Sequence, residues 1–488
     1  MDRDKVRSLL NKLAYQAHVS QPELVGTADV AESELIGGLM QVSQNPDARP
    51  GRLVEFLRDR AGLLLPRGVR VYTFPHRTFQ EYLAACHLTD EEYPDRVADL
   101  VRSDPNRWRE VALLAGAKAA RGTASAIWQL VEALCYEEPL AVGPAKGEGC
   151  WGALLAGQAL VETADLSQVS DRNRIKLERV KRWLVVILEQ NSLPALERVA
   201  AGQSLAILGD DRPRVGLRAD GLPDIAWCKV PAGPFVMGSD KKRDKWAEEN
   251  EQPQHEVRLP GYKISQYPVT NAHYQAFVDD EGYTEKWRHC WTKAGWEWKG
   301  DRRGPSRQGD VFDLPNHPVV AVAWYEAVAF CRWLTEQLRA VNELGADEII
   351  RLPSEAEWEK AARGTEGRRY PWSDEADPER MNYGKSGIGT TSAVGCFVGG
   401  ASPYGCQDMS GNVWEWGATK WQKKYPYKVE DEWSEAYLAG TDVCVLRGGA
   451  FNLQAYVARA ARRNVNFPDF IWSNYGFRLV RAPIGSGS

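Results

Sequence analysis

The chain of 488 residues changes character near residues 206–222, and this break constrains its fold more than any other feature. Before the break, apolar residues recur with a helical period, as in "WREVALLAGAKAA" and "RIKLERVKRWLVVILEQ". The last such stretch, "LPALERVAAGQSLAILGDDRPR", stops at Gly209 and Pro213, which terminate helices. After Trp227, short β-type runs alternate with many Gly and Pro residues, and Trp is frequent. The sequence therefore predicts a multidomain protein with an all-α N-terminal half and an α+β C-terminal domain.

Two helices are clearly signalled within the second half. The stretch "LPSEAEWEKAARG" places Ser354 at an N-cap, with Glu357 three residues later as in a capping box. Gly364 follows at the C′ position of the same helix. The stretch "NHPVVAVAWYEAVAFCRWLTEQL" predicts a strand-like run and then a helix. The residues expected on the buried face of that helix are Trp324, Val328, Cys331 and Leu334.

Length, charge and apolar runs narrow the class of protein. A chain of this length exceeds what one core usually serves, so two or more domains are expected. The formal net charge is -5 and no Lys/Arg-rich tract is present, so no nucleic-acid partner is expected. The N-terminus lacks the apolar region of a signal peptide, and no run of about 18 apolar residues follows. We therefore expect no membrane association and a cytoplasmic location.

The nine cysteines are scattered along the chain and form no CxxC pair. This pattern predicts buried free thiols rather than a structural zinc site or a disulfide framework. The final "GSGS" at 485–488 is interpreted as a linker left by protein expression and is excluded from the fold.

From Cys228 onward, eight motifs follow one another in the order of the formylglycine-generating-enzyme/sulfatase-modifying-factor family. They include "VPAGPFVMGS", "RLPSEAEWEKAARG", "DMSGNVWEW", "LRGGAF" and "YGFRLVRA". The chain resembles this family over residues 222–484, and the resemblance implies a variant of the C-type lectin fold. Composition alone would predict only a Trp-rich α+β domain.

The N-terminal half carries a second resemblance. The stretch "YTFPHRTFQEYLAACHL" is similar to the winged-helix region that follows the nucleotide-binding core of NACHT-type signalling ATPases. It predicts a winged-helix-like module at 1–90 and a helical, HEAT-like domain at 91–215. No GxxxxGK[ST] phosphate loop occurs in the sequence, so we expect no nucleotide within this chain. A NACHT-type ATPase core is then an expected partner, either in cis, if it was removed from this chain, or in trans.

Both catalytic branches of the C-terminal family require residues that this sequence lacks. Formylglycine-generating members use a cysteine pair after the "RGG" motif, where soft thiolates bind copper. Here residues 452–462 contain no Cys, and the last cysteine is Cys444. Sulfoxide-synthase members resembling the ergothioneine type use an HxxxHxE-like iron-binding cluster, and the seven histidines show no such spacing. We therefore expect the chain not to be an enzyme.

One metal site is implied by the family resemblance. In "DMSGNVWEW" the carboxylates of Asp408 and Glu415, with the carbonyls of Gly411 and Val413, match positions that hold a structural calcium ion. Hard oxygen ligands of this kind suit Ca²⁺ or Mg²⁺. The alternative is that Asp408 caps a turn and Glu415 forms a salt bridge.

The stretch from Arg447 to Val480 interleaves two kinds of residue and is similar to the variable region of diversity-generating-retroelement variable proteins. Its framework would comprise Arg447, Gly448, Gly449, Ala455, Arg459, Ala460, Ala461, Arg462, Pro468, Trp472, Gly476, Phe477 and Arg478. The variable, ligand-binding set would comprise Leu453, Tyr456, Val457, Asn464, Val465, Asn466, Phe467, Phe470, Ile471, Ser473, Asn474 and Tyr475. In the family, mutation of AAY codons produces the diversity, and such codons can yield all twelve residues. The framework arginines are expected to satisfy buried carbonyls or carboxylates through their planar fork.

These observations favour a ligand-recognition protein. A variable face on the C-type lectin-like domain would bind an unknown protein or other macromolecule and so bias the oligomeric state of the ATPase. One alternative is an oxidoreductase of the formylglycine-generating or sulfoxide-synthase type with an atypical active site, and another is a structural adaptor. The aromatic members of the variable set could also simply pack the core.

Overall fold

The computed structural model describes residues 3–23, 25–42, 49–60, 62–140, 147–428 and 432–484. The chain forms two compact units, Met1–Leu184 and Val185–Ser488. The expected boundary near 206–222 stays a prediction, and helix α10 (Ala195–Leu208) lies in the second unit. The "GSGS" segment lies outside the described residues. In the described part of the chain, no helix is both long and apolar enough to cross a bilayer.

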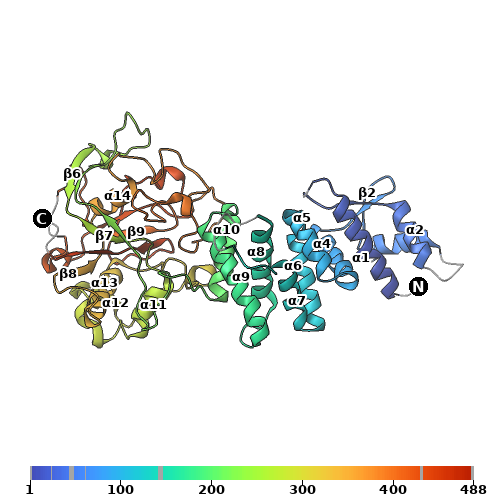
Figure 1. The fold of residues 1–488 in the computed structure, drawn as a ribbon. Coiled ribbons are helices and arrows are strands. Elements are labelled where there is room, and N and C mark those ends of the chain that lie inside the picture. Colours follow the sequence, from blue (N-terminus) through green and yellow to red (C-terminus); the bar gives the residue numbers. More distant parts are fainter. Residues whose placement is uncertain are drawn as a thin grey trace. The chain divides into compact units, whose positions relative to one another are not determined.

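The first unit begins with helices around a small antiparallel sheet (Figure 1). The strands lie in the order β1-β3-β2, and their bounds are Asp29–Ala31, Val71–Thr73 and Leu65–Gly68. The helices here are α1 (Arg3–Ser20), α2 (Glu32–Val42), α3 (Pro50–Glu55) and α4 (Arg77–Glu91). Leu10, Leu35 and Phe74 contribute to their shared apolar core. A small sheet packed with helices is the expected winged-helix-like arrangement.

In the described residues, the rest of the first unit contains five helices. They are α5 (Asp95–Ser103), α6 (Pro105–Gly122), α7 (Ser125–Leu134), α8 (Gly147–Thr163) and α9 (Asp171–Glu189), the last of which continues into the second unit. Asp104 caps α6 by accepting from the Arg107 amide, and Pro105 stands in its first turn. The helical period seen in the sequence is therefore confirmed here.

Sheets and helices alternate in the second unit after α10 (Figure 1). One four-stranded sheet has the order β11-β10-β9-β12, with bounds Asn464–Asn466, Cys444–Arg447, Trp414–Lys420 and Tyr475–Phe477. A second has the order β4-β7-β13-β8, with bounds Trp227–Val230, Tyr262–Ser265, Val480–Pro483 and Glu348–Arg351. A hairpin joins β5 (Gly233–Met237) to β6 (His255–Leu259). The helices are α11 (Asn271–Asp279), α12 (Lys293–Lys299), α13 (Trp324–Ala340), α14 (Glu355–Arg363) and α15 (Glu435–Leu438).

Both signalled helices are confirmed. In α14 the Ser354 hydroxyl accepts from the Glu357 amide, while the Glu357 carboxylate accepts from the Ser354 amide. Gly364 ends this helix with φ of 70°. Helix α13 buries Trp324, Val328, Cys331 and Leu334.

The strand-like run before α13 does not form a strand. Ala321 has a φ of 55°, which breaks the extended backbone. The amides of this run bond instead to carbonyls far along the chain, such as Val319 to Val269 and Ala321 to Trp472. The prediction of a strand there was wrong because these long-range bonds outweigh local propensity.

The nine cysteines form no disulfide bond in the structure, and the prediction that they are buried is confirmed for eight of them. Cys228 is the half-buried exception. The apolar cores of the second unit gather around α13 and α14, where Trp333, Trp358 and Phe477 are almost wholly buried.

Candidate functional site

The stretch after strand β10 begins with two glycines that no other residue could replace without strain. Gly448 and Gly449 have φ of 101° and 75°. A Cβ added at Gly449 would lie 2.7 Å from the Cα atom of Ala458, so the chain folds back closely on itself. The turn Ala455–Val457 and strands β11 and β12 follow. This tight path brings the rest of the stretch against α14.

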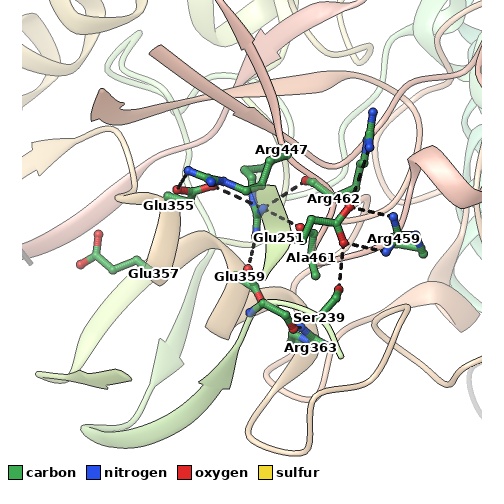
Figure 2. A network of polar contacts seen from close by, with 12 residues as sticks. Ser239, Glu251, Glu355, Glu357, Glu359, Arg363, Arg447, Arg459, Ala461 and Arg462 are labelled. Atoms are coloured by element: carbon green, nitrogen blue, oxygen red, sulfur yellow. Dashed lines mark hydrogen bonds and ion pairs between the residues drawn. The ribbon is translucent and has the colours of Figure 1, made fainter. Parts of the chain in front are cut away.

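Four arginines of the stretch are almost wholly buried, and we call them the arginine frame: Arg447, Arg459, Arg463 and Arg478. Arg447 lies between Glu355 and Glu359 of α14 (Figure 2). It also donates to the carbonyls of Ala461 and Arg462, at 3.0 and 3.1 Å. One guanidinium thus joins α14 to two points of the returning chain.

Arg459 fixes a distant loop to the same stretch. It pairs with Asp244 at 2.6 Å and with both oxygens of Glu251, at 2.8 and 2.9 Å. It also donates to the carbonyls of Trp246 and Tyr456. Glu251 accepts a further bond from the Ser239 hydroxyl (Figure 2). Residues 239–251 are therefore held against the turn Ala455–Val457.

The other two arginines complete the frame. Arg463 forms a two-bond pair with Glu355, at 2.6 and 2.9 Å. Arg478 forms a two-bond pair with Glu415, at 2.6 and 2.8 Å, and the Trp358 indole donates to the same carboxylate. The prediction that the arginines satisfy buried groups is confirmed for Arg447, Arg459 and Arg478. Arg462 is only half-buried and pairs with Glu248, and Arg463 was missing from the predicted framework.

Buried charges are stable here because each faces an opposite charge and further hydrogen bonds. Burial alone would raise the pKa of Glu359, but Arg447 and Arg363 outweigh it and the pKa is lowered. Glu359 therefore stays ionised. Removing one member of such a network leaves the other charge buried without a partner.

Outside this frame lies a set of exposed aromatic side chains. Tyr456, Phe467, Phe470 and Trp472 are 38%, 57%, 39% and 54% exposed. Trp246 from the Arg459-bound loop is 47% exposed and stacks on Tyr456, with ring centroids 4.8 Å apart. We call these five residues the aromatic face.

The backbone beneath part of the aromatic face is fixed. The Pro468 carbonyl accepts from the Trp324 amide, and the Trp472 carbonyl accepts from the amides of Ala321 and Tyr475. Phe470 and Trp472 stack with ring centroids 5.9 Å apart. These rings are therefore presented by an ordered loop.

The variable set divides by burial. Tyr456, Phe467 and Phe470 are exposed, while Leu453, Val457, Asn464, Val465, Asn466, Ile471 and Ser473 are half-buried. Whether any of them binds a ligand stays a prediction.

Two members of the variable set do not face solvent, so that expectation was wrong for them. Tyr475 lies in β12, where it pairs with Trp414 and packs edge-on against Trp416. The Asn474 carbonyl accepts from the Trp414 amide, and its side chain bonds to Asn452. Pairing of β12 with β9 therefore places both in the interior.

Two tryptophans also differ from expectation. Trp472 was predicted to belong to the framework but is exposed. Trp246 was not predicted at all, because it lies about two hundred residues upstream of the stretch. The only signal for Trp246 in the sequence was its position between Asp244 and Glu251. A buried arginine such as Arg459 needs carboxylate partners of this kind.

The carboxylates expected to bind a metal are both engaged by the protein. In Glu415 each oxygen accepts from Arg478, and one also accepts from Trp358. Asp408 accepts from the Gly395 amide at 3.0 Å, and burial raises its pKa to about 6. Gly411 and Val413 are buried beside them. A cation next to the Arg478 guanidinium would be repelled, so these residues do not fit a Ca²⁺ or Mg²⁺ site well, and the metal stays an untested prediction.

A further buried carboxylate adjoins the frame. Glu432 accepts from the hydroxyls of Thr419 and Tyr427, both at 2.6 Å. Burial raises its pKa to about 8, and the nearby Glu357 and Glu355 add to the effect. Glu432 is therefore protonated at neutral pH.

A cavity of about 340 Å³ opens beside the Arg459 cluster. Its lining includes Ser239, Arg243, Asp244, Arg369 and Arg459. The polar lining contrasts with the aromatic face, which the loop 239–251 also helps to form.

The fold and frame define an α+β domain of the C-type lectin-like, formylglycine-generating type. The family model for the sulfatase-modifying factor enzyme 1-like domain matches residues 223–483. The chain therefore belongs to this family, and the predicted fold class is confirmed. A second model, for the winged helix-turn-helix domain C-terminal to NACHT, matches residues 2–88.

Several relatives match about half of the chain. Hercynine oxygenase of Mycolicibacterium thermoresistibile is 36% identical over 275 residues, which are 51% of this chain and 57% of that protein. Formylglycine-generating enzyme of Thermomonospora curvata is 32% identical over 302 residues, which are 52% of this chain and 93% of that protein. The chain thus spans little more than half the length of the hercynine oxygenase.

Solved structures resemble about half of the chain. Treponema denticola variable protein 1 is 23% identical with a TM-score of 0.40, over 53% of this chain and 95% of that one. PvdO from Pseudomonas aeruginosa is 24% identical with a TM-score of 0.40, over 52% and 93%.

The expectation that the chain is not an enzyme is contradicted by the curated relatives. The hercynine oxygenase and the formylglycine-generating enzyme are both named as enzymes, and they are 36% and 32% identical to this chain. The missing cysteine pair was a local observation on residues 452–462 and did not exclude chemistry elsewhere.

Replacing Arg447 by Met should lower the free energy of unfolding of the second unit by about 3–5 kcal/mol, because Glu359 loses a buried partner. The matched control is Arg368→Met, which breaks an ion pair with the exposed Glu366 and should cost about 1 kcal/mol or less. Denaturant unfolding measures both. Equal costs would contradict a central role for the frame.

Replacing Glu432 by Gln should make the protein less sensitive to alkaline pH. The pKa of Glu432 is above the ordinary glutamate value of 4.5, so its contribution to stability is full below about 4.5 and is lost as pH rises through about 8. We expect Glu432→Gln to gain about 4 kcal/mol over the natural chain between pH 5 and pH 9, because each pKa unit corresponds to about 1.4 kcal/mol. Glu366→Gln, at an exposed position, should show no such gain, and a pH-independent difference for Glu432→Gln would contradict the prediction.

Proposed function

We propose that the chain is a ligand-recognition protein whose aromatic face binds a protein or another macromolecule. The observation that carries this proposal is the contrast between a buried arginine frame, whose members pair with buried carboxylates, and exposed aromatic rings on the same stretch. Large apolar rings left in water are costly, and two stacked pairs of exposed rings, Trp246 with Tyr456 and Phe470 with Trp472, favour a binding role. Tyr and Trp provide large, rigid contact area at low entropic cost.

The proposal extends to diversification of this face. The exposed Tyr456, Phe467 and Phe470 and the half-buried members of the variable set can all arise from AAY codons, as in retroelement variable proteins. The frame would keep the backbone in place while these side chains change. Trp472 and Trp246 cannot arise from AAY codons and would be constant members of the face.

The proposal also couples the face to signalling. The match of residues 2–88 to a NACHT-associated winged helix supports a role beside a NACHT-type ATPase core. Ligand binding would then bias the state of that ATPase. This coupling, like the identity of the ligand, rests on the proposed recognition function.

A second candidate function is oxidation of a thiol-containing substrate, and the named activities of the relatives favour it. Residues 452–462 contain no cysteine, but two cysteines from other parts of the chain lie in contact. Cys228 and Cys406 are in hydrogen-bonding contact, and this contact lowers the pKa of the half-buried Cys228 thiol. Mass spectrometry of a cysteine peptide incubated with the protein would detect turnover. Turnover lost in Cys228→Ser would assign the chemistry to this pair, and turnover retained in that variant would exclude the pair.

A display library tests the recognition function. Randomising Tyr456, Phe467, Phe470 and Trp472 together should leave most variants folded and yield binders to an unrelated target protein, because these positions carry little of the stability. A matched library at Ala460, Ala461, Gly476 and Phe477 should yield few folded variants. The readout is the fraction of displayed protein that resists proteolysis. Loss of folding in both libraries would contradict the proposal.

A further inference from the structure

Three potential metal ligands meet where the turn Glu285–Cys290 packs against helix α13. His289 and Cys290 end this 3-10 turn, and Glu336 lies in the helix. The His289 Nε2 atom is 2.9 Å from Glu336 Oε1, and the Cys290 Sγ atom is 4.0 Å from the same oxygen. The three ligand atoms all lie within 4.8 Å of one another. Among the described residues, no other group of three His, Cys, Asp or Glu donors is this compact.

The spacing is close to what a tetrahedral metal ion requires. Zinc bonds of about 2.0–2.3 Å place neighbouring ligand atoms roughly 3.3–3.7 Å apart. The observed separations lie on both sides of this range, so a shift of about an ångström would complete the geometry. The side chains of His289 and Glu336 are 57% and 45% exposed and are free to make such a shift.

The backbone that carries these ligands is well held. The Trp291 amide bonds to the Arg288 carbonyl, and the Arg332 guanidinium donates to the Cys290 carbonyl at 3.5 Å. Cys290 is fully buried, and Trp291 beside it packs into the main core. The thiol therefore provides a fixed point, while the two exposed ligands can adjust around it.

The chemistry of the donors selects the kind of metal. An imidazole, a thiol and a carboxylate suit borderline ions such as Zn²⁺, whereas Ca²⁺ and Mg²⁺ prefer oxygen alone. Burial raises the pKa of the Cys290 thiol to about 12, with Glu336 adding to the effect, so a metal must displace its proton. Thiolate and carboxylate would then balance the two charges of the ion.

We propose that His289, Cys290 and Glu336 bind one Zn²⁺ ion, with water in the fourth position. The site would join the Trp-rich segment around residues 285–298 to helix α13. It is independent of the aromatic face and does not rest on the proposed recognition function.

Cobalt provides a direct test, because a Co²⁺–thiolate bond gives a strong absorption band in the near ultraviolet. The metal-free chain of 488 residues titrated with Co²⁺ should develop this band with one ion per chain, and Zn²⁺ should abolish it. Cys290→Ala should remove the band. His289→Gln and Glu336→Gln, at exposed positions that spare the fold, should each weaken cobalt binding by roughly tenfold or more.

A second histidine–carboxylate pair is the matched control. His87 and Glu91 in α4 lie 3.7 Å apart, so His87→Gln removes a similar contact elsewhere. It should leave the cobalt titration unchanged. Zn²⁺ should also raise the melting temperature of the natural chain but not of Glu336→Gln. Absence of the band, or a band that survives in all three site variants, would overturn the proposal.

Discussion

The pairing of Arg447 with two glutamates of α14 is the interaction on which the rest of the C-terminal domain depends. A fully buried guanidinium is tolerated only where opposite charges and carbonyls surround it. Glu355 and Glu359 provide the charges, and the carbonyls of Ala461 and Arg462 accept two further bonds. Because these four groups come from two separate parts of the chain, Arg447 fixes the returning stretch on the helix. Arg459 and Arg478 repeat this arrangement with other carboxylates, and Arg463 shares Glu355 with Arg447.

The frame has a direct consequence for function. A residue that lies outside the strands and has an exposed side chain can vary without loss of the fold. Tyr456, Phe467 and Phe470 are such residues. Arg459 also adds a surface from elsewhere in the chain, since it holds the loop that presents Trp246. The aromatic face is therefore a composite of two segments. A composite face on a rigid support suits recognition of a macromolecule, and it is compatible with chemistry after binding of the kind that the relatives' names indicate.

Local signals in the sequence predicted much of the structure. The capping box at Ser354 and the apolar period of α13 gave both helices, and the residue pattern after "RGG" indicated buried arginines. The predictions that were wrong concerned residues whose position depends on hydrogen bonds between segments far apart in the sequence. Asn474 and Tyr475 are interior because β12 pairs with β9, Trp472 is exposed because its loop lies outside that pairing, and Ala321 leaves the extended conformation to bond with Trp472. Nothing local to the stretch could have revealed Trp246, or the contact between Cys228 and Cys406.

The most direct measurement compares the stability cost of the aromatic face with that of the interior of the same stretch. Replacing Tyr456, Phe467, Phe470 and Trp472 by Ser, singly and together, should change the free energy of unfolding by about 0.5 kcal/mol or less per position. Replacing the fully buried Phe477 by Ala should cost about 3–5 kcal/mol, since a cavity is left in the core. Denaturant unfolding of the full chain, followed at the transition of the second unit, would give both values. Face substitutions as costly as Phe477→Ala would show that the rings are part of the core and would contradict the separation of frame and face.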